Sequence, residues 1–164
     1  MTPQDQIPVG VITGFLGSGK TTLLSRLLKH PRMGRSAVII NEFGEVGLDH
    51  DVVAAATDDT ILMEGGCICC TVRSDMIDTL RSLFLRRVQG ELPPFERLLI
   101  ETTGLADPAP ILHTLMADPL VATRYRLDSV VATVDAVNAG GQLDRHPESV
   151  KHAAAAGRLL PAQT

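Results

Sequence analysis

Gly14-Phe15-Leu16-Gly17-Ser18-Gly19-Lys20-Thr21 is the stretch that decides the fold of this 164-residue chain. It fits the pattern G-x-x-x-x-G-K-[ST], a glycine-rich loop that cradles the phosphates of a nucleoside triphosphate. Residues 7–13, directly before it, are apolar and rich in β-branched side chains, which predicts a buried strand. Residues 22–29, directly after it, carry leucines at helical spacing and are followed by His30-Pro31. A strand and a helix are the context that this motif requires.

The residue types of the loop suit an anion. Gly14, Gly17 and Gly19 allow backbone conformations that bring successive N–H groups close to phosphate oxygens. The helix that begins near Gly19 adds the positive end of its dipole. We expect Lys20 to reach the β- and γ-phosphates and Thr21 to offer its hydroxyl to Mg²⁺.

Composition restricts the other functions of the chain. Its length corresponds to about one domain, and a hydrophobic fraction of 45% is that of a globular protein. A net charge of −4 gives no basic surface for nucleic acid or for a membrane. No apolar run approaches the ~20 residues that span a bilayer. The amino terminus lacks the features of a signal peptide, so we expect a cytoplasmic protein.

Short buried strands alternate with helices along the chain. Further strands are predicted over residues 36–40, 95–100 and 128–135, with a weaker candidate over residues 60–63. A helix is predicted from an N-cap at Ser74 to Gly90, a second through residues 111–116, and an alanine-rich segment over residues 151–156 follows a polar loop. Residues 51–59 fit a helix or a strand. The alternation predicts an α/β fold with a mostly parallel sheet flanked by helices.

Glycines and acidic residues follow the predicted strand at residues 36–40. Ligands of open α/β sheets bind outside the carboxyl ends of the strands, the edge from which the phosphate loop also leaves. Glu42 and Glu45 are therefore candidates for holding Mg²⁺, directly or through water. The alternative is that they are solvated loop acids.

The three cysteines, Cys67, Cys69 and Cys70, lie together in one glycine-led loop. This spacing is a poor disulfide framework and a better metal or redox site. Thiolates suit Zn²⁺, and three of them leave a coordination position for water, for His50 or Glu64, or for a partner's ligand. Unligated buried thiols, redox-active thiols and half of a site shared in a homodimer are the alternatives.

Taken together, these motifs resemble the CobW-like family of P-loop GTPases of the SIMIBI class, which act as metal chaperones or metal-insertion proteins. The resemblance covers about residues 9–151. It is carried by residues 14–22, 41–49, 66–73, 101–108 and 134–136. It implies GTP, Mg²⁺ and Zn²⁺ or Co²⁺ as ligands, and a metalloprotein client as partner.

The resemblance also implies a role for each matching residue. The implied nucleotide-binding residues are Gly14, Gly17, Ser18, Gly19, Lys20, Thr21, Thr22 and Gly104, with Gly104 near the γ-phosphate. The implied catalytic residues are Lys20, Thr21, Glu42 and Glu101, of which Thr21, Glu42 and Glu101 bind or sense Mg²⁺. Cys67, Cys69 and Cys70 are the implied ligands of the transition metal.

The sequence departs from the family near its end. Relatives continue into Ala-Asp-Arg, a buried strand and an Asn/Thr-Lys-x-Asp motif that reads guanine. Here Gly157 stands where an aspartate is expected, and Pro161 is expected to break the strand. The resemblance therefore implies a shortened member, a single P-loop domain over residues 1–164 without the family's smaller carboxyl-terminal domain. It leaves the preference for GTP over ATP open.

We expect GTP hydrolysis to be coupled to metal binding. In this hypothesis the γ-phosphate and Mg²⁺ order residues 41–49, and that loop biases the geometry of the three cysteines. No side chain can be named as a general base, so slow hydrolysis by positioning and electrostatics is expected. The alternatives are a P-loop kinase acting on a small metabolite and a non-catalytic fragment that binds metal weakly.

Overall fold

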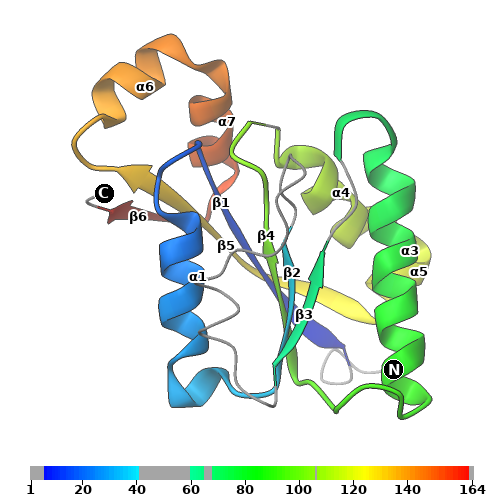
Figure 1. The fold of residues 1–164 in the computed structure, drawn as a ribbon. Helices are drawn as coiled ribbons and strands as arrows, with labels where there is room; N and C mark the ends of the chain where they lie inside the picture. Colours follow the sequence, from blue (N-terminus) through cyan, green and yellow to red (C-terminus); the bar gives the residue numbers. More distant parts are fainter. Residues whose placement is uncertain (1–5, 41–59, 65–67, 106, 163–164) are drawn as a thin grey trace.

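The computed structural model describes residues 6–40, 60–64, 68–105 and 107–162. Its centre is a six-stranded sheet with the strand order β3-β2-β4-β1-β5-β6, and every pair of neighbouring strands is parallel (Figure 1). The strands are β1 (Ile7–Gly14), β2 (Ser36–Ile40), β3 (Ile61–Glu64), β4 (Arg97–Glu101), β5 (Tyr125–Asp135) and β6 (Arg158–Ala162). The predicted α/β fold with a parallel sheet is confirmed.

Helices flank this sheet on both faces. They are α1 (Lys20–Leu28), α3 (Ile68–Val88), α4 (Ala109–Ala117), α5 (Pro119–Ala122), α6 (Ala139–Arg145) and α7 (Pro147–Ala155), with a short 3₁₀ turn, η2, at Pro31–Met33. Helix α1 lies on one face, and α3, α4 and α5 lie on the other (Figure 1). Helices α6 and α7 lie at the end of the sheet toward which the strands point. No helix in the described ranges combines the length and the apolar character needed to cross a bilayer.

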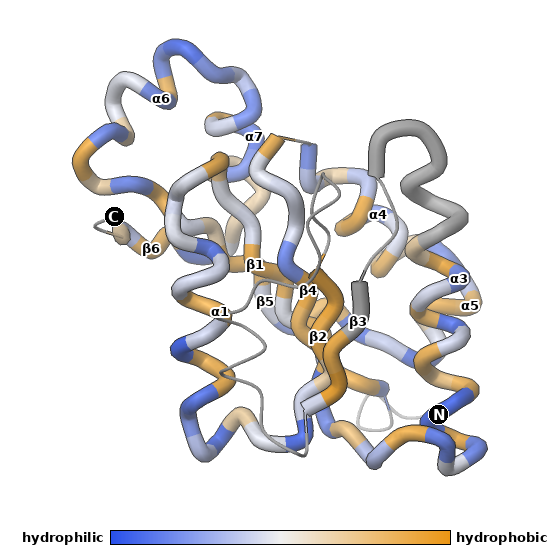
Figure 2. Tube along the Cα trace, in the orientation of Figure 1, coloured by the Kyte–Doolittle hydropathy of each residue, from blue (hydrophilic) through white to orange (hydrophobic). Residues whose placement is uncertain are grey.

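Two apolar clusters hold the layers together. Leu24 and Leu28 of α1 pack in one cluster with Ile12 of β1, whereas Val9 and Val11 belong to the cluster beneath α3 and α4. Side chains of a strand alternate between its faces, so consecutive residues of β1 serve opposite layers. The central strands β2 and β4 are apolar along most of their length (Figure 2). Continuous apolar strands are expected where a parallel sheet is buried on both faces.

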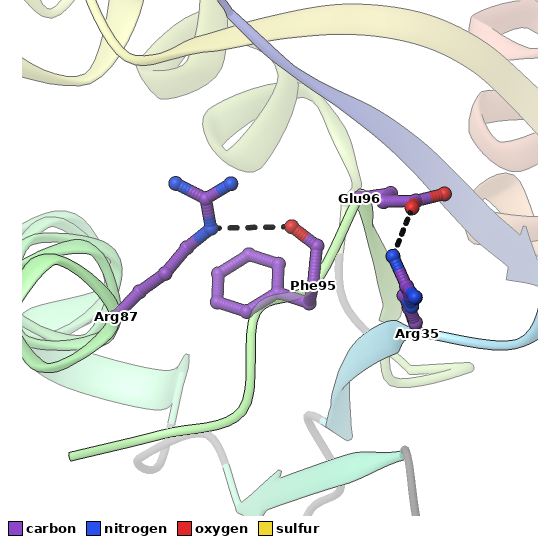
Figure 3. Close-up of polar contacts among 4 residues, drawn as sticks. All are labelled: Arg35, Arg87, Phe95 and Glu96. Carbon is purple, nitrogen blue, oxygen red and sulfur yellow. Dashed lines mark hydrogen bonds and ion pairs between the residues drawn. The ribbon is translucent and has the colours of Figure 1, made fainter. Parts of the chain in front are cut away.

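Two arginines hold the chain where it enters β4. Arg87 of α3 donates from Nε to the carbonyl of Phe95 at 3.2 Å and lies 5.3 Å above the centre of the Phe95 ring (Figure 3). Arg35, just before β2, forms an exposed ion pair of 2.9 Å with Glu96, and its carbonyl accepts a hydrogen bond from the Glu96 N–H. The exposed ion pair itself contributes little stability. Together these contacts set the register in which β4 ends at Glu101.

The expected start of α3 is wrong. The helix begins at Ile68 instead of after a cap at Ser74. No glycine or proline lies between Ile68 and Ser74, so the sequence holds no signal that would stop the helix from extending toward β3. As a result, the backbone of Cys69 and Cys70 lies in the first turn of α3.

The expected break at Pro161 is also wrong. Residues 158–162 form β6, which pairs with β5 over its length. The strand lies at the edge of the sheet and Pro161 is its second-last residue, a place where a strand tolerates the loss of one ladder N–H. The polar segment after β5, expected as a loop, contains α6.

Candidate nucleotide-binding site

The glycine-rich loop joins β1 to α1, as predicted. Gly17 and Gly19 have φ angles of 75° and 91°, in the left-handed region that glycine adopts without strain. Gly14 has a φ of 143°, and a Cβ there would lie 2.5 Å from the carbonyl oxygen of Thr133. Backbone shape and close packing against β5 therefore both require glycine in this loop.

Lys20 is the buried cation of the loop. Its Nζ donates hydrogen bonds to the carbonyl oxygens of Gly14 at 2.9 Å and of Phe15 at 3.2 Å. Both acceptors belong to the loop itself, so the ammonium group lies inside the curve of the backbone. A fixed positive charge at this position suits the β- and γ-phosphates of a nucleotide.

Thr21 and Glu101 meet at the entrance to α1. The hydroxyl of Thr21 donates to Oε1 of Glu101 at 2.9 Å. Glu101 reaches this place because β4 runs parallel to β1 with Ile12 opposite Glu101. A hydroxyl and a carboxylate oxygen are hard ligands of the kind that Mg²⁺ prefers. The two residues are 80 positions apart in the chain, and the structure brings them together.

The chain after β4 lies directly against the glycine-rich loop. Thr102, Thr103 and Gly104 are buried. A Cβ at Gly104 would lie 2.4 Å from the nitrogen and 2.7 Å from the Cα of Leu16. Gly104 was predicted near the γ-phosphate, and it lies against the backbone of the glycine-rich loop.

A buried polar network beneath the loop was not predicted. The hydroxyls of Ser18 and Thr133 lie 2.6 Å apart, and Thr102 Oγ1 donates to Thr13 Oγ1 at 2.9 Å. Oγ1 of Thr13 also lies 2.5 Å from Nδ1 of His152, a fully buried residue of α7. The sequence signal for this network was a threonine at the carboxyl end of each of three neighbouring strands. No sequence signal pointed to His152, because it lies on a helix 139 positions after Thr13.

Two titratable groups near this network have shifted pKa values. Burial, and then the positive charge of Lys20, lower the pKa of His152. The Gly104 backbone and the carboxylates of Asp107 and Glu148 act in the opposite direction. The pKa of Asp107 is lowered mainly because its carboxylate accepts a hydrogen bond from the Ala109 N–H.

A cleft of about 800 Å³ opens beside the loop. It is lined by Gly19, Thr22, Leu23 and Arg26 of the loop and α1, by Thr133 and Ala136 of β5 and the segment after it, and by Leu160, Pro161 and Ala162 of β6. Gly19 and Thr22, two predicted nucleotide-binding residues, therefore border a space that continues away from the phosphate loop.

Part of the predicted site falls outside the described residues. Glu42, Glu45, His50 and Cys67 are in this group, and so are the side chains of Cys69, Cys70 and Glu64. Within the ranges that the structure covers, no three metal-ligating side chains lie together. The start of α3 follows β3, so the backbone of Cys69 and Cys70 lies at the same carboxyl edge of the sheet as the glycine-rich loop (Figure 1).

A family model described as the nucleotide-binding domain of CobW/HypB/UreG matches residues 8–160. The chain belongs to the CobW/HypB/UreG family. Two curated relatives agree: the zinc chaperone YjiA of Escherichia coli K12 is 39% identical over 158 residues, and the zinc chaperone CobW of a Sinorhizobium species is 42% identical over 151 residues. The crystal structure of Zn(II)-bound YjiA GTPase from E. coli has a TM-score of 0.72 and 36% identity to this CobW-family chain.

These relatives are longer than the chain described here. The match to YjiA covers 96% of this chain and 49% of YjiA, and the match to CobW covers 87% and 41%. The match to the YjiA structure likewise covers 95% of this chain and 49% of YjiA. The chain therefore spans about half the length of its relatives or less, and the shared part is the nucleotide-binding domain.

The contact between Gly104 and Leu16 leads to a stability prediction. Gly104→Ala places a methyl group into the backbone of the glycine-rich loop, so the two segments must separate, and we expect unfolding to become easier by about 1–3 kcal/mol. Gly140→Ala is the matched control because nothing lies within 4 Å of its Cβ position. Urea unfolding of both variants measures the difference. Equal stabilities for the two variants would contradict the contact.

Proposed function

We propose that this chain binds GTP and Mg²⁺ at the glycine-rich loop, hydrolyses GTP, and couples its nucleotide state to a transition metal held by Cys67, Cys69 and Cys70. The observation that carries the proposal is the hydrogen bond of 2.9 Å between Thr21 and Glu101, next to the buried Lys20. The names of the relatives, a GTPase and zinc chaperones, support GTP and Zn²⁺ as the ligands.

Each part of the nucleotide has a place in the proposed complex. The backbone of residues 17–22 and the Lys20 ammonium hold the phosphates, with the N-terminus of α1 behind them. Thr21 and Glu101 hold Mg²⁺, which neutralises the charge of the β- and γ-phosphates. The sugar and base lie in the cleft beyond Gly19 and Thr22. The described residues that line this cleft include no carboxylate that could accept hydrogen bonds from the base, so we expect them to discriminate weakly between bases.

The proposed hydrolysis rests on positioning. Lys20 stabilises negative charge that develops between the β- and γ-phosphates, from a buried position in which its ammonium group is held by the carbonyls of Gly14 and Phe15. The segment Thr102–Gly104, packed on the loop, limits the space around the γ-phosphate and the access of water to it. Glu42 completes the Mg²⁺ site in this proposal as part of a loop that responds to the γ-phosphate.

Metal binding is coupled to the nucleotide through the sheet edge. The strand order β3-β2-β4-β1 puts β3, the strand before α3, three strand spacings from β1, the strand before the glycine-rich loop, which is about 14 Å. The carboxyl ends of β2 and β4 lie between those of β3 and β1 along this edge. In this proposal, nucleotide-dependent movement of the chain after β2 changes the position of the cysteines, and the transition metal is the cargo.

Nucleotide binding is tested by a thermal melt. GTP with Mg²⁺ at 100 times its Kd stabilises a protein by about 2.7 kcal/mol, and we expect a corresponding rise in Tm. Lys20→Ala removes the buried ammonium and is expected to abolish the rise, whereas Lys29→Ala, an exposed change at the end of the same helix, keeps it. Phosphate release then separates a hydrolase from a kinase, which would yield a phosphorylated product. Equal melts with and without nucleotide contradict the proposal.

The coupling is tested by Zn²⁺ affinity measured against a chromophoric chelator. A non-hydrolysable GTP analogue is expected to tighten Zn²⁺ about 5- to 150-fold, the usual range of such coupling, and Zn²⁺ must tighten the analogue by the same factor. Cys69→Ala is expected to weaken Zn²⁺ and spare the nucleotide, and Lys20→Ala is expected to remove the coupling. Identical Zn²⁺ affinities with and without the analogue would exclude it.

A further inference from the structure

Helix α7 has two buried polar residues, Ser149 and His152, and the proposed nucleotide chemistry uses neither. The side chain of His152 is 1% exposed and lies behind the glycine-rich loop. Its ring contacts Thr13, the second-last residue of β1. Burying a polar ring costs free energy unless it is hydrogen-bonded, so this contact calls for an explanation.

The hydroxyl of Thr13 accepts one hydrogen bond and has one proton of its own to donate. Thr102 Oγ1 donates to Thr13 Oγ1, so the single hydroxyl proton of Thr13 is available for Nδ1 of His152. With Nδ1 as the acceptor, the neutral ring carries its proton on Nε2, which is buried near the Gly104 backbone without a hydrogen bond of normal geometry among the described residues. The lowered pKa of His152 is consistent with a neutral ring at pH 7.

A second chain of hydrogen bonds ends on the same residue. Thr133 Oγ1 donates to the carbonyl oxygen of Thr13 at 3.3 Å, which leaves Ser18 Oγ as the donor to Thr133. Ser18 belongs to the glycine-rich loop, and Thr102 directly follows Glu101. Thr13 thus joins the loop, the end of β4 and α7.

The rest of α7 and the segment before it also contact these parts. The ring of His146, which precedes α7, stacks on Phe15 with centroids 4.6 Å apart. Lys151, next to His152, pairs with Asp107 at 3.2 Å, in the chain that follows Gly104. Helix α7 is therefore connected both to the glycine-rich loop and to the segment after β4.

We propose that His152 is a positioning residue whose neutral ring orients Thr13 and, through Thr13, holds Thr102 and the end of β4 against the glycine-rich loop. The inference rests on the proposed function, because Glu101 and the glycine-rich loop need this placement only if they bind GTP and Mg²⁺. When Nδ1 is protonated, it donates to Thr13 Oγ1 instead of accepting from it. Thr13 Oγ1 then accepts from both Thr102 and His152, and the hydroxyl proton of Thr13 no longer has Nδ1 as its acceptor.

This arrangement predicts a pH dependence with a definite sign. Since the pKa of His152 in the folded protein is lowered from 6.5, the unfolded chain binds more protons, and stability falls as the pH drops through about 6.5 toward the lowered value. The charged groups that act on the ring are Lys20 of α1, Asp107 before α4, and Glu148 of α7. Asp107 stays ionised in this range because its pKa is lowered from 3.8.

The spectroscopic test does not depend on nucleotide. Long-range ¹H–¹⁵N NMR of the histidine rings, with the His152 signals assigned by their loss in His152→Gln, reports the tautomer directly. We expect a neutral ring at pH 7 with the proton on Nε2 and Nδ1 as acceptor. A proton on Nδ1, or a ring that is charged at pH 7, would overturn the inference.

The functional test compares two substitutions at the same site. His152→Asn keeps an acceptor for Thr13, because its Oδ1 is bonded to Cγ as Nδ1 is, and is expected to retain GTP–Mg²⁺ affinity within about threefold. His152→Leu keeps only an apolar side chain and is expected to lose about tenfold in affinity, the effect of one hydrogen bond. Thr13→Val should lose as much GTP–Mg²⁺ affinity as His152→Leu. The double variant Thr13→Val/His152→Leu should lose no more affinity than either single variant. Lower pH should weaken GTP–Mg²⁺ binding by the wild type and affect His152→Asn less.

Two controls separate positioning from simple destabilisation. Leu115→Ala, in the core beneath α4, lowers Tm but should leave GTP–Mg²⁺ affinity unchanged, and His113→Gln, at an exposed histidine, should change neither. Equal losses of affinity in His152→Asn and His152→Leu, or a matching loss in Leu115→Ala, would refute the positioning role. If the wild type binds no nucleotide, the proposed function fails, and the NMR tautomer alone decides the hydrogen-bond network.

Discussion

The hydrogen bond between Thr21 and Glu101 joins the two halves of the candidate site, and it exists only because β1 and β4 are parallel neighbours in a fixed register. Glu101 stands opposite Ile12 of β1 on one side and Ile40 of β2 on the other. A shift of β4 by one residue would turn the Glu101 side chain to the other face of the sheet. Arg87 and Arg35 contact the opposite end of the same strand, where β4 begins.

Polar groups concentrate at the Glu101 end of a largely apolar core. Lys20 and Glu101 are both buried, and so are Thr13, Thr102 and Thr133. Burying charges costs stability, and the cost is reduced when they are hydrogen-bonded, as Lys20 and Glu101 are. Departures from an apolar core are expected where a protein binds or reacts, because preorganised charge is what the site supplies. The apolar clusters beneath α1 and α3 supply the compensating stability.

The sequence predicted what depends on local pattern. Residues 36–40 form the predicted strand, and the glycine-rich loop lies between a strand and a helix because glycine, apolar runs and leucine spacing act over short distances. The start of α3 and the pairing of the strand that contains Pro161 depend on the surrounding sheet. Predictions from helix caps and from proline alone were therefore wrong at both places. The pairing of Thr13 with His152 links positions 139 apart, and no spacing rule in one sequence can find it. The roles of Glu42 and of the three cysteines stay predictions.

The central claim is that Thr21 and Glu101 act as one Mg²⁺-binding unit at the phosphate loop. A double-mutant cycle measures it most directly, with GTP affinity determined by calorimetry with and without Mg²⁺ for the wild type, Thr21→Val, Glu101→Gln and the double variant. The account predicts that each single variant loses most of the Mg²⁺-dependent gain in affinity and that the double variant loses no more than either. An undiminished Mg²⁺ effect in both single variants, or losses that simply add, would contradict it.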